Sequence, residues 1–124
     1  MALKIKVDYT PVVNLAMQQN GVHVIREIKF LNDGETPLHD ISVCISFEPG
    51  FAEKYEMHID RIDPGYEEVV PNPPLRFSTV YLSNVTERLM GGMRLEAIPS
   101  DGPGFESVYE IAVLAYYPMA GHHY

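Results

Sequence analysis

Four acidic residues lie around a Pro-Gly turn in the middle of the chain, where they could bind a hard cation. They are Asp60, Asp63, Glu67 and Glu68. Carboxylate oxygens are the ligands that calcium prefers, but the spacing fits a calcium loop only loosely. The Asp-Pro-Gly sequence also makes an ordinary turn between strands, with the acids solvated beside it. We therefore predict no metal at this turn.

The five histidines are the other candidate metal ligands. His122 and His123 are adjacent, so in an extended chain they point to opposite sides and do not chelate one ion. His23, His39 and His58 fall on the polar positions of predicted strands, where solvent exposure is the simplest interpretation. We therefore predict no metal site and no cofactor.

No motif for nucleotide hydrolysis or covalent catalysis is present. The sequence lacks GxxxxGK[ST], GxSxG and HExxH, and so lacks a phosphate-binding loop, a serine-hydrolase turn and a zinc-protease helix. Cys44 has no CxxC partner and lies on an outward strand position, which favours a structural residue over a nucleophile. We expect this chain not to be an enzyme.

The sequence contains eight tyrosines and no tryptophan, so tyrosines make up most of the aromatic surface that could stack on a ligand. Tyr9, Tyr55 and Tyr109 share positions with the predicted core, and Tyr81 and Tyr117 are among the tyrosines that we expect to be exposed. A carbohydrate-binding face built on such tyrosines stays an alternative. The predicted interaction surface comprises Tyr81, Tyr117, His122 and His123.

Length and charge restrict the class of protein. A chain of 124 residues fits one domain, which we assign to residues 1–121, with 122–124 as the start of a linker or the chain end. The net charge of -8 repels a polyanion, so direct nucleic-acid binding is not expected. One cysteine, no secretory signal and no long apolar run favour a cytoplasmic protein that does not cross a membrane.

Alternating apolar residues predict strands along most of the chain. The pattern is clearest in Asp40–Glu48, where Ile41, Val43, Ile45 and Phe47 face inward. A helical turn is predicted only in residues 78–92, with Ser83 as its cap. About seven short strands separated by Gly and Pro turns predict an all-β, immunoglobulin- or fibronectin-III-like sandwich. The other predicted strands are LKIKVDY, VHVIREIKFLN, YEMHI, a short strand after the Asp-Pro-Gly turn, MRLEAI and FESVYEIAVLAYY.

Several runs resemble the N-terminal region of very large bacterial superfamily-1 helicase-like proteins. They are LAMQQNGVHVIREIKFLN, FEPGFAEKYEMHIDRIDPG, LSNVTERLMGG and VLAYYPMAG, in that order over nearly the whole chain. The family's Pro-Gly-Phe turn is matched by residues 48–51. Its LxxLTE element is matched at residues 82–87, with Val85 in place of the second leucine. Met119 stands where the family has tryptophan.

The resemblance implies an accessory domain ahead of helicase motifs, often followed by a nuclease-like segment. ATP and nucleic-acid sites would then lie beyond residue 124, in a protein of DNA repair or defence. We expect a non-catalytic interaction domain whose partner is another protein or the rest of the same polypeptide, with self-association also open. The alternative is a free-standing carbohydrate- or ligand-binding sandwich.

Overall fold

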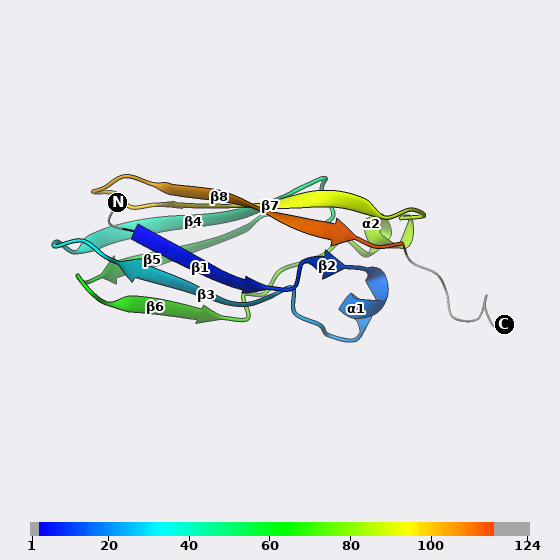
Figure 1. The fold of residues 1–124 in the computed structure, drawn as a ribbon, viewed down its shortest axis with the longest axis horizontal. Coiled ribbons are helices and arrows are strands. Elements are labelled where there is room, and N and C mark those ends of the chain that lie inside the picture. Colours follow the sequence, from blue (N-terminus) through cyan, green and yellow to red (C-terminus); the bar gives the residue numbers. More distant parts are fainter. Residues whose placement is uncertain (1–2, 116–124) are drawn as a thin grey trace.

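The computed structural model describes residues 3–115 and consists mainly of β-strands in two layers, with two short helices toward one end (Figure 1). The prediction of an all-β fold is confirmed. The elements in chain order are β1 (Leu3–Tyr9), β2 (Val12–Val13), α1 (Leu15–Gln19), β3 (Ile25–Asn32), β4 (Leu38–Glu48), β5 (Tyr55–Ile62), β6 (Glu67–Pro71), α2 (Thr79–Ser83), β7 (Leu89–Ile98) and β8 (Phe105–Val113).

The strands form two sheets that enclose one core. One sheet has the order β1-β3-β6 and the other has the order β2-β8-β7-β4-β5. Neighbouring strands are antiparallel except β2 and β8, which are parallel. Ile28 and Phe30 from the first sheet pack with Ile41, Ile45 and Leu95 from the second, and all five are fully buried.

Strand β4 lies between β7 and β5 in the larger sheet and alternates as the sequence predicts. Ile41, Val43, Ile45 and Phe47 are buried as predicted, and the strand pairs with β5 on one side and β7 on the other. Burying every second side chain against the other sheet is what the period of two requires.

The polar interruption at Arg26 in the next strand pattern marks a β-bulge. Tyr9 pairs with Ile25 and Asp8 pairs with Glu27, so Arg26 is the extra residue. Its guanidinium lies outside the sheet and donates to Asp8 and to Thr10. The extra residue changes which positions face inward. β3 begins only at Ile25, so Val22 lies outside the strand and is exposed, whereas Val24 is buried.

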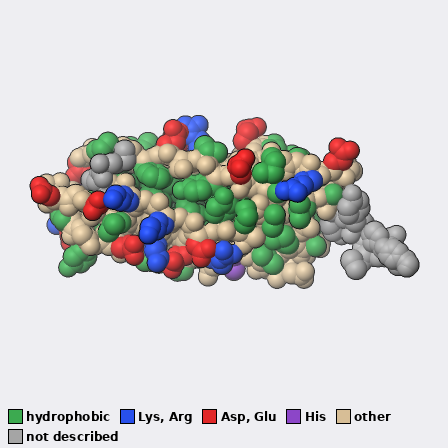
Figure 2. Space-filling model, in the orientation of Figure 1, with side chains coloured by type: hydrophobic (Ala, Val, Ile, Leu, Met, Phe, Trp, Pro, Cys, Tyr) green, Lys and Arg blue, Asp and Glu red, His purple; other side chains and the backbone are tan. Residues whose placement is uncertain are grey.

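The start of the chain changes sheets at Pro11. β1 pairs with β3, whereas β2 pairs with β8 through hydrogen bonds from the Ala112 N–H to the Pro11 oxygen (2.8 Å) and from the Leu114 N–H to the Val13 oxygen (2.9 Å). Figure 2 shows hydrophobic side chains across the middle of the face on which β1 and β8 lie. This face is therefore the side of the molecule where the two layers meet at their edges.

Both helices are short and begin at a side-chain cap. The Asn14 Oδ1 accepts from the Met17 N–H at 2.9 Å, and the Ser78 Oγ accepts from the Tyr81 N–H at 3.1 Å. The predicted helical turn is thus present but begins earlier, because Ser78 and not Ser83 is its cap. Helix α1 was not predicted, since its run of amides resembled a loop. Neither helix is long and apolar enough to span a membrane, over residues 3–115.

Asn32 is the one buried polar residue in the described part of the chain. Its Nδ2 donates to the oxygens of Thr36 (2.8 Å) and Ile62 (2.9 Å), and its Oδ1 accepts from the Gly34 N–H. Its backbone N–H donates to the Tyr66 oxygen and its backbone oxygen accepts from the Gly65 N–H. One side chain and its peptide groups therefore connect β3, the turn after it, β5 and the β5–β6 turn.

An aromatic cluster occupies the opposite end of β4. Phe51 is fully buried and its ring packs against Phe47, Phe77 and Tyr81, with centroids 5.4 to 6.4 Å apart. A Cβ built on Gly91 of β7 would lie 2.7 Å from the Phe51 Cε2 and 3.0 Å from the Glu48 oxygen. Glycine at position 91 is therefore needed for the close approach of β7 to this ring.

Replacing Gly91 with alanine should destabilise the fold by about 1–3 kcal/mol, because the new methyl group overpacks Phe51. Urea denaturation followed by circular dichroism measures this change. Gly92→Ala is the matched control, since its Cβ would meet only the Val108 Cγ1 at 3.4 Å. Equal stability of the two variants would contradict the packing argument.

Candidate functional site

A groove of about 670 Å³ lies on the surface beside α2. Its apolar lining comes from Val80, Tyr81, Val85 and Leu89, and its other wall includes Gly50. The groove therefore lies between the loop that follows β4 and the segment that joins α2 to β7. A concave, largely apolar surface of this size is the usual form of a binding site.

Helix α2 holds the groove in place through its buried side. Leu82 is fully buried and Val85 is nearly so, which anchors the helix and the turn after it. The Asn84 Nδ2 donates to the Val80 oxygen at 2.8 Å and closes the end of the helix. The opposite side leaves Val80 71% exposed, the largest exposure of any described large hydrophobic residue. Val80 therefore adds exposed apolar surface to the groove that Tyr81 and Leu89 also line.

Tyr81 is the one predicted interaction residue that the structure describes, and it lies in this groove. Its ring is half-buried and packs on Phe51, so the tyrosine is held by the aromatic cluster. Tyr117, His122 and His123 lie outside the described residues. Val80 was missed in the sequence, because a valine within a short helical turn is ordinarily assigned to the core.

The polar lining of the groove includes two charged residues and three residues that carry a hydroxyl group. The charged residues are Glu87 and Arg88, both exposed, and the hydroxyl-bearing residues are Ser78, Tyr81 and Thr86. The Ser78 hydroxyl accepts a helix N–H. Histidine, cysteine and aspartate do not line the groove within residues 3–115.

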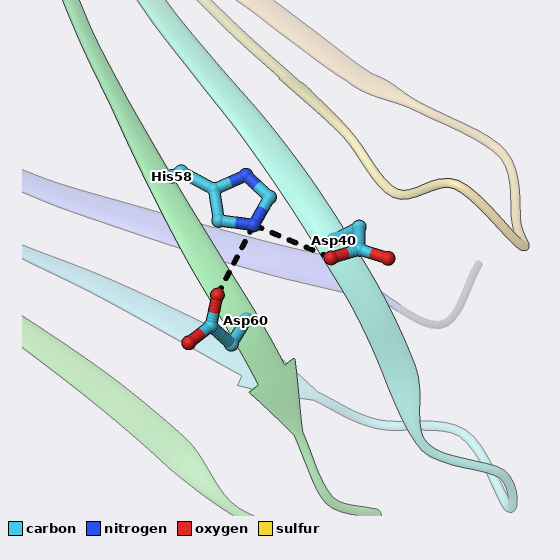
Figure 3. Close-up of side chains that lie close together, drawn as sticks. All are labelled: Asp40, His58 and Asp60. Atoms are coloured by element: carbon cyan, nitrogen blue, oxygen red, sulfur yellow. Dashed lines mark ion pairs between the residues drawn. The ribbon is translucent and has the colours of Figure 1, made fainter.

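A second cluster lies on the edge strand β5 and its neighbour β4 (Figure 3). The His58 Nε2 lies 3.4 Å from the Asp40 Oδ1 and 3.2 Å from the Asp60 Oδ1. One imidazole nitrogen and two carboxylates are a ligand set that a divalent metal accepts. All three side chains are exposed, however, and surface ion pairs account for the arrangement. Of the acidic residues near the turn, Asp60 belongs to this cluster, whereas Asp63 pairs with Arg61.

The pKa values of Asp101 and Cys44 are shifted by their surroundings. The His39 imidazole bonds to the Asp101 carboxylate at 2.7 Å and the His39 N–H donates to it at 3.1 Å, which lowers the pKa of Asp101. Burial raises the pKa of the Cys44 thiol. A raised pKa leaves less thiolate at neutral pH, so Cys44 is a weaker nucleophile than a free cysteine.

No protein-family model and no curated relative matches this sequence. Among solved structures the chain is similar to the YadV chaperone, with 12% identity and a TM-score of 0.48, over 93% of this chain and 52% of the chaperone. It spans about half the length of that chaperone. It is also similar to the structural genomics target SoR45, with 14% identity and a TM-score of 0.36, over 99% of this chain and 95% of that one. Both likenesses are distant.

The Asp101 carboxyl should titrate below its ordinary value in the folded protein, because the hydrogen bond from His39 favours the charged form. Its stabilising contribution is present above the unfolded pKa of about 3.9 and is lost as pH falls through the lower folded pKa. Carboxyl-carbon NMR measures the titration. His39→Ala should raise the pKa only part of the way, since the backbone N–H of residue 39 remains. An unchanged pKa in that variant would contradict the assignment.

Proposed function

We propose that the chain is a non-catalytic interaction domain with an immunoglobulin- or fibronectin-III-like fold, the N-terminal module of a bacterial ATP-dependent DNA helicase-like protein. The strand orders β1-β3-β6 and β2-β8-β7-β4-β5 support this fold, because such sandwiches pair two mainly antiparallel sheets of similar size. The helicase connection is supported by the sequence runs that resemble that family.

The groove beside α2 is the observation that carries the proposed function. It is anchored by Leu82 and Val85, it is lined by Tyr81, and it presents Val80 to solvent. Tyrosine is enriched at the centres of protein interfaces, and the buried core of an interface is more apolar than the surrounding surface. The occupant we propose is a protein segment, from a partner or from the rest of the same polypeptide, that inserts an apolar side chain beside Val80.

The charge distribution supports protein recognition and not nucleic-acid recognition. The chain has nine lysines and arginines against seventeen acidic residues. Six of the nine basic side chains, those of Lys4, Arg26, Lys29, Lys54, Arg61 and Arg94, already form ion pairs with carboxylates. Nucleic-acid binding needs clustered basic groups that are free to neutralise phosphates and so release the counterions held by the nucleic acid.

A carbohydrate-binding domain is the second candidate, favoured by the position of Tyr81 in the groove. A tyrosine face can stack on a sugar ring. Binding on a glycan array that is lost with Tyr81→Ala would favour this candidate. The gene region after codon 124 tests the helicase connection directly, because a GxxxxGK[ST] motif there is expected.

A photo-crosslinking amino acid at position 80 should capture a protein segment in the full-length protein, in cells or after purification. The physical reason is that Val80 is the most exposed apolar side chain of an anchored groove. Mass spectrometry of the crosslinked product identifies the segment. The same amino acid at Val69, an exposed valine of β6 outside the groove, is the control. Equal yields at both positions would contradict a groove-specific partner.

The isolated domain should not shift a DNA duplex or single strand in a gel, even at low salt, because its net charge of -8 repels phosphates. A domain of matched size with a basic surface serves as the positive control. Tight binding at low salt would refute the separation between an accessory domain and downstream DNA-binding sites.

A further inference from the structure

The outer edge of β8 has no strand beside it over most of its length. β8 pairs with β7 from Phe105 to Val113, but on its other side β2 covers only Ala112 and Val113. Within residues 3–115, the stretch from Phe105 to Glu110 therefore forms a free sheet edge. An unpaired edge is a template for the addition of another strand.

The backbone groups that face this edge belong to the even-numbered residues. The N–H groups of Ala112 and Leu114 donate toward β2, and the Glu110 oxygen accepts from the Tyr9 hydroxyl at 3.1 Å. Since alternate residues of an antiparallel strand bond to opposite sides, Val108 and Glu106 also direct their N–H and C=O groups outward. Tyr9 occupies only the last of these positions, so the edge around Val108 is open.

The side chains around this edge are partly apolar. Val108 is 64% exposed in the middle of the strand, although its neighbours on the outer face, Glu106 and Glu110, are charged. On the inner side, Ile5, Phe105 and Tyr109 are only half-buried. The hydrophobic band across the middle of this face is visible in Figure 2. An added strand would cover apolar surface as well as pair the backbone.

The charges of β8 disfavour a second copy of the same strand. An antiparallel pair centred on Val108 would place Glu106 of each copy opposite Glu110 of the other, and like charges directly opposite destabilise a strand pair. Lysine or arginine opposite Glu110 would form a cross-strand pair instead, and one opposite Glu106 would share that carboxylate with Arg94 of β7. The edge is therefore complementary to a basic segment and not to itself.

Three other edges fit a basic added strand less well. β1 ends the smaller sheet and exposes Lys4 and Lys6, which repel a basic segment. The outer face of β5 is charged along the strand at Glu56, His58 and Asp60. β6 has only five residues and ends in Pro71, which has no N–H to donate. Of these four edges, that of β8 has an exposed apolar residue between two acidic residues.

We propose that the edge of β8 binds an extended basic segment of a partner protein as an added antiparallel strand. Lysine or arginine of that segment lies opposite Glu106 and Glu110, and a β-branched residue lies opposite Val108. This site is separate from the groove beside α2, so the two proposals can fail independently.

The test uses ¹⁵N-labelled protein and a synthetic heptapeptide, capped at both ends, of sequence Thr-Lys-Thr-Val-Thr-Lys-Thr. We expect peptide binding to shift the amide resonances of Glu106 and Val108 and to slow their hydrogen exchange. A peptide with glutamate in place of lysine should bind about tenfold more weakly or not at all, because two cross-strand charge pairs become repulsive.

Three variants identify the site. Val108→Pro should abolish binding, because it removes an outward N–H that β7 does not use. Glu110→Lys keeps every backbone group and should weaken binding about three- to tenfold, which covers the case in which the proline variant does not fold. Val80→Lys in the groove should leave binding unchanged. Slowed exchange on β5 in place of β8, equal binding of the two peptides, or dimerisation through β8 would each overturn the proposal.

Discussion

The relative position of the two sheets depends on the buried amide of Asn32. Its Nδ2 donates to one oxygen of β5 and one oxygen of the turn after β3, and its Oδ1 accepts a third bond from that turn. Only a side chain with two donors and an acceptor at this position satisfies all three groups. Aspartate lacks the two N–H donors, and leucine lacks both the donors and the acceptor oxygen. Each buried polar group left without a hydrogen bond costs about 1–3 kcal/mol of folding free energy. At this end of the molecule, the hydrogen bonds of Asn32 therefore link β3 to β5 beside the buried side chains of Leu38 and Ile62.

The opposite end is held by aromatic packing, and this difference explains where the groove lies. β4 begins near the Asn32 turn and ends at the loop that carries Phe51, so it connects the two ends of the molecule (Figure 1). Tyr81 of α2 packs on Phe51, which in turn stacks on Phe77. The groove beside α2 lies at this end, and Tyr81 belongs both to the aromatic cluster and to the lining of the groove.

The sequence predicts the strands well and their arrangement poorly, for a physical reason. Alternation in β4 reports the burial of each side chain, and the buried set there was predicted correctly. The bulge at Arg26, the change of sheet at Pro11 and the burial of Asn32 depend on residues far away in the sequence. Tyr81 was predicted as an interaction residue, whereas Val80 and the free edge of β8 were not. Exposure at those positions is decided by which segments happen to lie beside them.

The short parallel pair between β2 and β8 has a mechanical consequence. Tension that enters through β1 pulls β2 toward its amino end, while tension that leaves through β8 pulls toward the carboxyl end. The two strands run in the same direction, so these forces are opposed along the strand axis and load the pair in shear. The hydrogen bonds at Ala112 and Leu114 then resist together and do not open one after the other. We expect this pair of two residues in each strand to resist separation of β2 from β8 when the chain is under tension.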